Sequence, residues 1–221
     1  MGGLKIGNKQ IMAKQKDAYL GDIIHEGGLA ISAETTINHR YGRIFSSIIE
    51  VSAILDDFRI DTIGGLVAGH EIYELALLPS LLNNADTWVE LNEASVSKLD
   101  NLQNAMFRNL FGVPASTPIP LLRFDLGCLK MEERINQKKL MFLHHLKSLK
   151  SDSLAGEIFE LQTKYGFPGL VTECRKLIIK YKLPNIIDEN LNLSKVQWKS
   201  LVKNVILEES QKNVRQEFQG F

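Results

Sequence analysis

A chain of 221 residues is long enough to bury one sizeable hydrophobic core or two small ones. Its 26 Lys and Arg balance its 26 Asp and Glu, which excludes proteins that attract nucleic acid or membranes by net charge alone. No apolar run reaches the roughly 18 residues of a membrane span, and Cys128 and Cys174 lack the short spacings of a zinc site or disulfide framework. We therefore expect an intracellular protein of the cytoplasm or nucleus, with no membrane partner.

Sequence typical of β-strands is confined to the first 25 residues. Two short segments, 4–6 and 9–13, flank Gly7 and Asn8, a pair that suits the tight turn of a β-hairpin. Alternation of residue types predicts a third strand over 18–24. Strands this short and this few are near the lower limit for an independently stable sheet.

From residue 32 onward the pattern is helical. Ser32 is the predicted N-cap of a long helix whose apolar residues form one stripe, at Ile37, Tyr41, Ile44, Ile48, Val51 and Leu55. A second helical segment covers about 61–84. A third follows Asn92 and has its own stripe at Leu99, Leu102, Met106 and Leu110. We predict that these segments pack as an antiparallel bundle with the stripes in its core.

The segment GVPASTPIP, at 112–120, breaks the helical pattern and is the predicted domain boundary. About four more helices are expected beyond it. One contains Ile135 and Phe142, two flank the Gly166–Gly169 turn, and the last begins at Ser194. The two tryptophans, Trp88 and Trp198, lie in apolar-periodic contexts and are predicted to anchor the core.

Three short motifs suggest chemistry, and each has a plainer interpretation. In ILDDF, at 54–58, the adjacent carboxylates resemble a two-metal site, but neighbours at a helix end point about 100° apart. GHEIYE, at 69–74, lacks the second histidine of a zinc-protease helix, and GGLVAGH, at 64–70, has His70 where a phosphate loop needs Lys. We therefore predict no metal site, no cofactor and no catalytic residues.

The stretch AYLGDIIHEGG, at 18–28, resembles the primer-grip segment of reverse transcriptases from animal non-LTR retrotransposons. In that family an aromatic-Leu-Gly strand closes the palm, and the chain passes directly into a helical thumb. The sequence LLPSLLNNADTWVEL, at 77–91, is similar to the family's Pro-x-Leu-Leu…acid-x-Trp segment, and 99–127 and 134–149 are similar to its post-thumb region. The resemblance extends over about 15–165. The family's Tyr-x-Asp-Asp turn and first metal-binding Asp lie upstream of the primer grip, and neither stands before Gln15 here.

The resemblance implies a mainly α fold with short N-terminal antiparallel strands. Residues 1–30 would be the end of the palm with the primer-grip strand, 31–111 the helical thumb, and 112–221 a helical post-thumb extension. Such a piece would hold an RNA or DNA primer–template duplex, weakly on its own, and would pair with the missing palm and fingers, but it would not polymerise by itself. The residues expected to contact nucleic acid surround the strand-to-thumb junction: Lys14, Lys16, Tyr19, Leu20, Gly21, Arg40 and Arg43.

Other interpretations remain open. Solvated surface charges explain the junction bases equally well. A second basic zone after the thumb would extend the contact with nucleic acid, through Arg108, Arg123, Lys130, Arg134, Lys138 and Lys139. The alternative function is a host-retained helical module that binds proteins or nucleic acid without enzymatic activity, and such a module should present a coherent surface patch.

Overall fold

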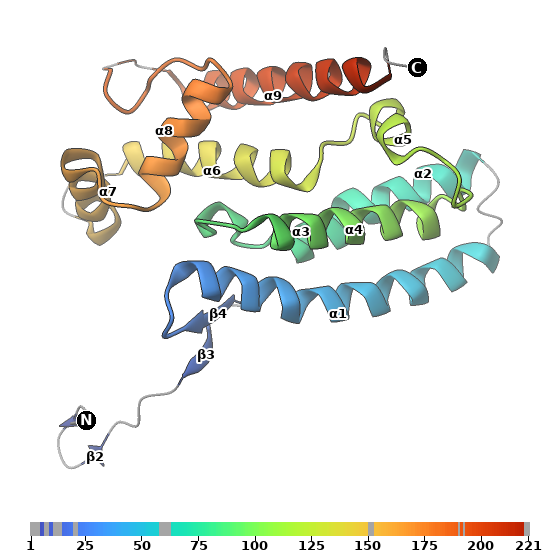
Figure 1. The fold of residues 1–221 in the computed structure, drawn as a ribbon, viewed down its shortest axis with the longest axis horizontal. Coiled ribbons are helices and arrows are strands. Elements are labelled where there is room, and N and C mark those ends of the chain that lie inside the picture. Colours follow the sequence, from blue (N-terminus) through green and yellow to red (C-terminus); the bar gives the residue numbers. More distant parts are fainter. Residues whose placement is uncertain are drawn as a thin grey trace.

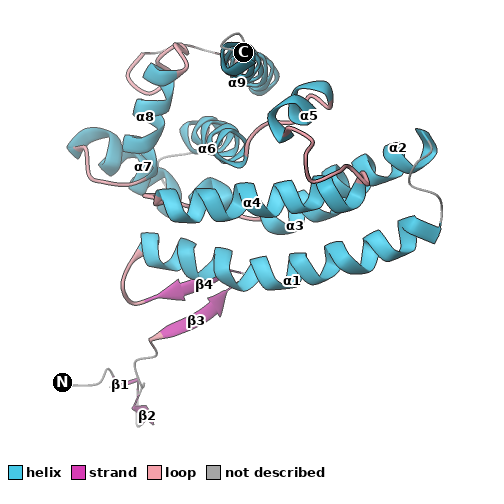
Figure 2. Ribbon diagram, turned by 45° about the vertical axis from the view of Figure 1, so that its right-hand side comes forward, coloured by secondary structure: helices cyan, strands magenta, loops and turns pink. Residues whose placement is uncertain are grey.

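The computed structural model describes residues 5–6, 9–10, 15–19, 22–57, 63–149, 153–189, 191 and 193–218. Within them the fold is mainly α, as predicted, with short antiparallel strands at the N-terminal end (Figures 1 and 2). The helices are α1 (Leu29–Asp57), α2 (Ile63–Ile72), α3 (Leu78–Leu81), α4 (Glu93–Leu110), α5 (Ile119–Asp125), α6 (Met131–Lys147), α7 (Leu154–Tyr165), α8 (Leu170–Lys180) and α9 (Lys195–Phe218). A π-helical turn, η1 (Tyr73–Leu77), joins α2 to α3, and a short 3-10 turn, η2 (Ala85–Thr87), follows α3.

The helices form successive layers (Figure 1). The long helix α1 lies on one side, the stretch from α2 to α3 returns beside it, and α4 runs back again. Consecutive segments therefore reverse direction, as an antiparallel bundle requires. Helices α5 and α6 form the next layer, and α9 lies on the far side of the molecule from α1 (Figures 1 and 2).

The strands form two hairpins instead of one sheet. Strand β1 (Lys5–Ile6) pairs antiparallel with β2 (Lys9–Gln10), as predicted, and β3 (Lys16–Tyr19) pairs antiparallel with β4 (Asp22–His25). The single strand predicted over 18–24 is wrong, because the chain reverses between Tyr19 and Asp22, which lie opposite each other. Directly opposite partners in an antiparallel pair share a face of the sheet, whereas a period of two read straight through 18–24 would put Tyr19 and Asp22 on opposite faces.

Helix α1 covers the outer edge of β4. The backbone N–H of Ile23 donates to Thr36 Oγ1 at 2.8 Å, and that of His25 donates to Ser32 Oγ at 2.9 Å. Ser32 and Thr36 are one helical turn apart, which matches the two-residue spacing of outward N–H groups on a strand. An edge strand that would otherwise present free donors is thereby tied to the helix.

The predicted N-cap at Ser32 is wrong, because this hydroxyl bonds to β4 from inside the helix. Helix α1 begins at Leu29, and the Ser32 hydroxyl lies one turn inside it, where it donates to the Gly28 carbonyl at 2.7 Å. The hydroxyl serves the strand edge rather than the first free N–H groups of the helix.

Replacing Thr36 by valine should loosen the β3–β4 hairpin without unfolding the helices. The new side chain keeps the volume of a buried position but leaves the Ile23 N–H without its acceptor, a cost of about 1–3 kcal/mol. NMR-detected hydrogen exchange at the Ile23 amide should report this change as faster local exchange. Thr35→Val is the matched control, because the Thr35 hydroxyl donates only within its own helix, to Ile31. Equal exchange in the two variants would contradict the account.

Buried apolar side chains form two clusters that meet on α6. The first contains the predicted stripe residues Ile37, Ile44, Ile48, Leu99, Leu102, Met106 and Leu110, which confirms the stripes; the side chain of Leu55 lies outside the described residues. The second lies between α6, α8 and α9 and includes Trp198, while Trp88 is buried in the first. Met131 and Ile135 of α6 belong to the first cluster, and Leu140 and Leu143 to the second. The change of packing partner thus falls within α6, and the domain boundary at 112 stays a prediction.

The later helices agree with the sequence analysis except at one point. Asn92 caps α4 by accepting from the Ser95 N–H at 2.7 Å, α7 and α8 flank the Gly166–Gly169 turn, and α9 follows Ser194. Helix α5 was not predicted, because it begins inside the proline-rich segment. Pro120 stands in its first turn, where a missing N–H costs nothing.

Candidate functional site

The junction between the β3–β4 hairpin and the helices is organised by Asp22. This residue opens β4, and its carboxylate accepts two hydrogen bonds. Oδ1 accepts from Arg40 Nη2 of α1 at 2.6 Å, and Oδ2 accepts from Asn84 Nδ2 at 2.8 Å, in the turn after α3. One side chain therefore fixes the hairpin against two separate parts of the helical bundle.

The guanidinium of Arg40 is committed to protein groups. Its Nη1 donates to the carbonyls of Leu81 and Asn83, at 3.1 and 2.5 Å, and its Cζ lies over the Trp88 ring, 5.6 Å from the ring centroid. These carbonyls stand at the C-terminal end of α3, where intrahelical partners run out and a positive charge is favoured. Burial lowers the pKa of Arg40, while the Asp22 carboxylate opposes that shift. Arg40 is buried, and its predicted contact with nucleic acid stays a prediction.

A polar groove of about 330 Å³ runs between α1 and α3 beside this ion pair. Arg43 and Ser47 of α1 form one wall, and Ser80 of α3 with Asn83 forms the other. Arg43 is exposed and pairs with no acidic side chain among the residues that the structure describes. Its guanidinium, the two hydroxyls and the amide are the groups that proteins use to contact phosphate oxygens.

An apolar cavity of about 350 Å³ lies on the other side of the ion pair, between β4, the start of α1 and η2. Ile23, Ala33 and Trp88 line it, and Ile24 and Leu29 at its rim are 56% and 64% exposed. Large aliphatic side chains exposed side by side around a cavity are typical of a surface that another protein segment covers.

The remaining predicted contact residues are only partly described. Lys16 is exposed on β3 opposite His25, and Tyr19 lies opposite Asp22. Lys14, Leu20 and Gly21 lie outside the described residues, so their part in the site stays a prediction. Of the seven junction residues, the structure brings together Arg40 and Arg43 in the walls of one groove.

Most of the second basic zone is engaged within the fold. Arg134 pairs with Glu74, Lys139 pairs with Glu173, and Arg123 is buried, where it donates to Asn104 Oδ1 at 2.8 Å and lies 3.6 Å from Asp100. Arg108 donates to the Pro114 carbonyl. Arg123, Arg134 and Lys139 thus join separate elements of the fold.

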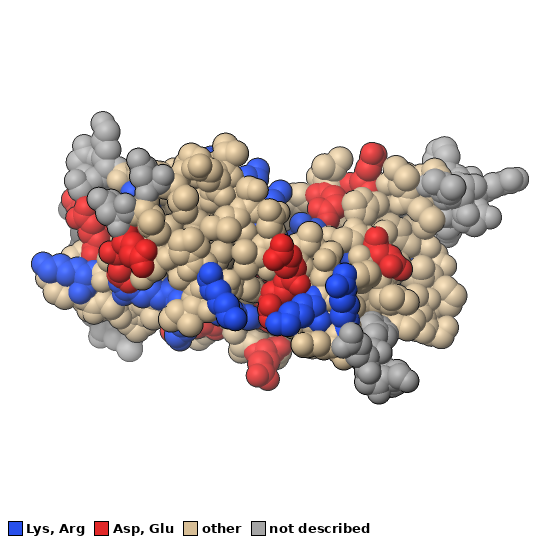
Figure 3. All heavy atoms as spheres, turned by 90° about the horizontal axis from the view of Figure 1, so that it is seen from above, with Lys and Arg blue, Asp and Glu red and all other residues tan. Residues whose placement is uncertain are grey.

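The face of the molecule that includes α9 carries both basic and acidic side chains. Basic and acidic side chains are interspersed on it and leave broad areas with neither (Figure 3). Electrostatic attraction of a polyanion to this face is therefore weak.

Neither cysteine is an activated nucleophile in this fold. Burial raises the pKa of the Cys128 thiol to about 11 and that of Cys174 to about 12. Both thiols are protonated at neutral pH, and the protonated form is a poor nucleophile. In the part of the chain that the structure describes, one group of His, Cys and acidic side chains is close enough to share a metal ion: His70, Glu74 and Cys128.

Comparison with known proteins gives no relative: no protein-family model, curated protein or solved structure matches the chain. Among the helices of the described residues, none is both long and apolar enough to cross a membrane.

Proposed function

We propose that this chain binds the sugar–phosphate backbone of an RNA or DNA duplex, as the thumb and post-thumb part of a reverse transcriptase of the non-LTR retrotransposon type. The resemblance of residues 15–165 to that family supports the proposal. The role is binding rather than catalysis, because the 221 residues contain no Tyr-x-Asp-Asp sequence and so lack the carboxylate pair that polymerisation uses.

The observation that carries the proposal is the groove between α1 and α3. It offers the exposed guanidinium of Arg43, which pairs with no acidic side chain among the described residues, together with two hydroxyls and one amide. The channel has a volume of about 330 Å³, and no acidic side chain lines it. Phosphate contacts of this kind fix position without reading sequence, as a polymerase thumb requires. A single strong base also fits a weak autonomous affinity, because each neutralised phosphate contributes separately to binding.

The ion pair of Asp22 with Arg40 supports the same role indirectly. It fixes the β3–β4 hairpin, which corresponds to the primer-grip segment, at a constant distance from the α3 wall of the groove. A rigid junction of this kind would keep a duplex in one register between hairpin and helices.

The apolar cavity beside β4 supports a protein partner as well. Its exposed rim residues, Ile24 and Leu29, lie at the junction where the resemblance places the thumb next to a polymerase palm. The same surface also favours the second candidate function, a host-retained helical module that binds another protein. The two candidates differ at the groove, because only the first needs Arg43.

Binding of a fluorescein-labelled RNA–DNA hybrid duplex, measured by anisotropy at several salt concentrations, tests the proposal. The chain should bind at low salt, and Arg43→Gln should weaken binding and reduce the slope of log K against log salt by about one. Lys199→Gln is the matched control, because Lys199 is an exposed base on α9, in the layer far from the groove. Absence of binding at the lowest salt, or equal losses in the two variants, would favour the protein-binding module.

A further inference from the structure

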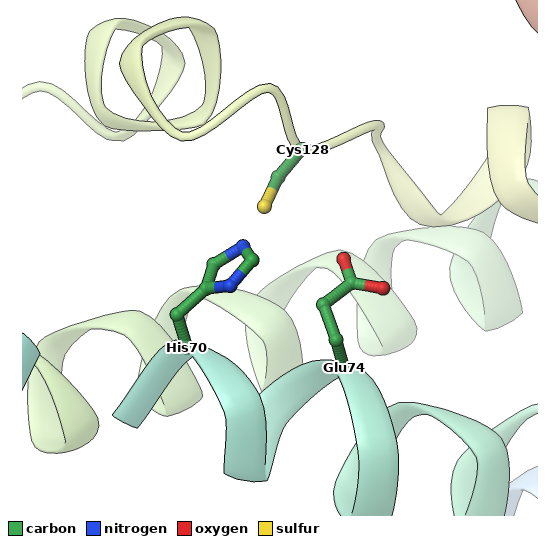
Figure 4. A group of neighbouring side chains, drawn as sticks. All are labelled: His70, Glu74 and Cys128. Atoms are coloured by element: carbon green, nitrogen blue, oxygen red, sulfur yellow. The ribbon is translucent and has the colours of Figure 1, made fainter. Parts of the chain in front are cut away.

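His70 and Glu74 share one side of the helical stretch that runs from α2 into η1. They are four residues apart, and both side chains are half-buried and point toward Cys128 (Figure 4). The helix that carries them is held close to α4 at Gly69, where a Cβ would come within 2.7 Å of the Leu110 carbonyl oxygen. The absence of a side chain at Gly69 therefore allows this stretch to lie close to the end of α4.

Cys128 reaches this position from the loop after α5. Its N–H donates to the Arg123 carbonyl at 2.8 Å, and Gly127 before it has a φ of +62°, which glycine adopts without strain. Gln103 of α4 then clamps the loop to the helix, because its Nε2 donates both to the Tyr73 hydroxyl at 2.7 Å and to the Leu129 carbonyl at 2.9 Å. Gln103 and Tyr73 are fully buried, so the clamp is shielded from water.

We propose that His70, Glu74 and Cys128 form a binding site for Zn²⁺ or another divalent cation that accepts nitrogen, oxygen and sulfur ligands. Their ligand atoms all lie within 4.8 Å of one another. Around a tetrahedral zinc ion with Zn–S of about 2.3 Å and Zn–N of about 2.0–2.1 Å, ligand atoms lie about 3.5 Å apart. Small side-chain rotations would shorten the distances between the ligand atoms from at most 4.8 Å to about 3.5 Å. The thiol proton is released to solvent as the metal–sulfur bond forms, and water completes the fourth position.

Arg134 orients the acidic ligand. Its guanidinium pairs with Glu74 Oε1, and Oε2 accepts no hydrogen bond from the residues that the structure describes. A carboxylate held through one oxygen presents the other in a fixed direction, as outer partners of metal ligands commonly do. The positive charge of Arg134 reduces affinity for a cation, so the thiolate and imidazole must supply most of the binding.

A bound ion would join η1 to the loop that precedes α6. The site is thus a structural link between the first three helices and the later ones, and it is independent of duplex binding at Arg43. The sequence analysis expected no metal site, because it looked for ligands at short spacings, and Cys128 stands 54 residues from Glu74 in the sequence.

Titration of the reduced, full-length chain with Co²⁺ tests the proposal, because a cobalt–thiolate bond gives a near-ultraviolet charge-transfer band that other ligands do not. We expect one Co²⁺ per chain with this band, and its loss when Zn²⁺ is added. Cys128→Ser should abolish the band, while Cys174→Ser, at the other buried thiol, should retain it. His70→Gln should lower Co²⁺ affinity by about tenfold or more.

Circular dichroism of each variant shows whether it remains folded, and His70→Gln decides the matter if Cys128→Ser does not fold, because His70 is only half-buried. The proposal is overturned by a wild-type chain that shows no thiolate band at saturating Co²⁺. It is equally overturned by a band that follows Cys174, or by unchanged affinity in a folded His70→Gln chain.

Discussion

Replacing Arg40 by methionine should lower the free energy of unfolding by about 2–4 kcal/mol, close to the cost of removing one partner from a buried ion pair. The substitution removes the bond to Asp22 and both bonds to the Leu81 and Asn83 carbonyls. Methionine keeps the apolar stem of the side chain but ends near the position of Nε, so the loss combines the missing charge and donors with the buried space that the guanidinium filled. The value lies below the extreme for such pairs, because the Asp22 side chain keeps some solvent exposure and a second partner in Asn84.

Urea unfolding measures this change, and the chain supplies a matched control. Arg43 lies one turn along the same helix but is exposed, so Arg43→Met should alter stability by less than about 0.5 kcal/mol. In a double-mutant cycle with Asp22→Asn, Arg40→Met should show a coupling of at least about 0.5 kcal/mol, because the two side chains are in direct contact. Equal effects of Arg40→Met and Arg43→Met would mean that Arg40 is a surface base.

Replacing Ile48 by alanine should destabilise the chain by about 2–5 kcal/mol, as truncation of a fully buried side chain does. Ile48 has no exposed surface and packs in the cluster that α1 shares with α4, so the lost methyl and methylene groups leave a cavity lined by rigid neighbours.

The adjacent Ile49 is the control for this experiment. It is 54% exposed, so Ile49→Ala should cost far less than Ile48→Ala in the same unfolding measurement. A loss below about 0.5 kcal/mol for Ile48→Ala would mean that the apolar stripe of α1 does not face the core.

The helical part of the fold was predictable because its signal is local. The stripe from Ile37 to Ile48 repeats with the period of a helix, and burial of one face follows from that period alone. The cap at Asn92 was predictable on similar grounds, since a side chain that accepts from an N–H three residues later needs no distant partner.

The candidate sites were less predictable because their partners are distant in the sequence. The residues next to Arg40 in the sequence do not indicate that Asp22 and a carbonyl at the end of α3 contact its guanidinium. Its charge alone therefore suggested an exposed base. Ser32 has the residue type of a helix cap, but its hydroxyl accepts from the His25 N–H of β4 instead of from an N–H of its own helix. Arg43, by contrast, was predicted as an exposed junction base, and it is exposed, because no tertiary partner among the described residues overrides its local preference.

Photo-crosslinking of the full chain to an RNA–DNA hybrid duplex, followed by mass spectrometry of the crosslinked peptides, tests the proposed function most directly. Crosslinks should concentrate in 40–47 of α1 and 79–83 at the end of α3, the two walls of the groove, and Arg43→Gln should reduce them while Lys199→Gln should not. Crosslinks confined to α9 or spread evenly over the chain, with the groove peptides unmodified, would contradict duplex binding at this groove.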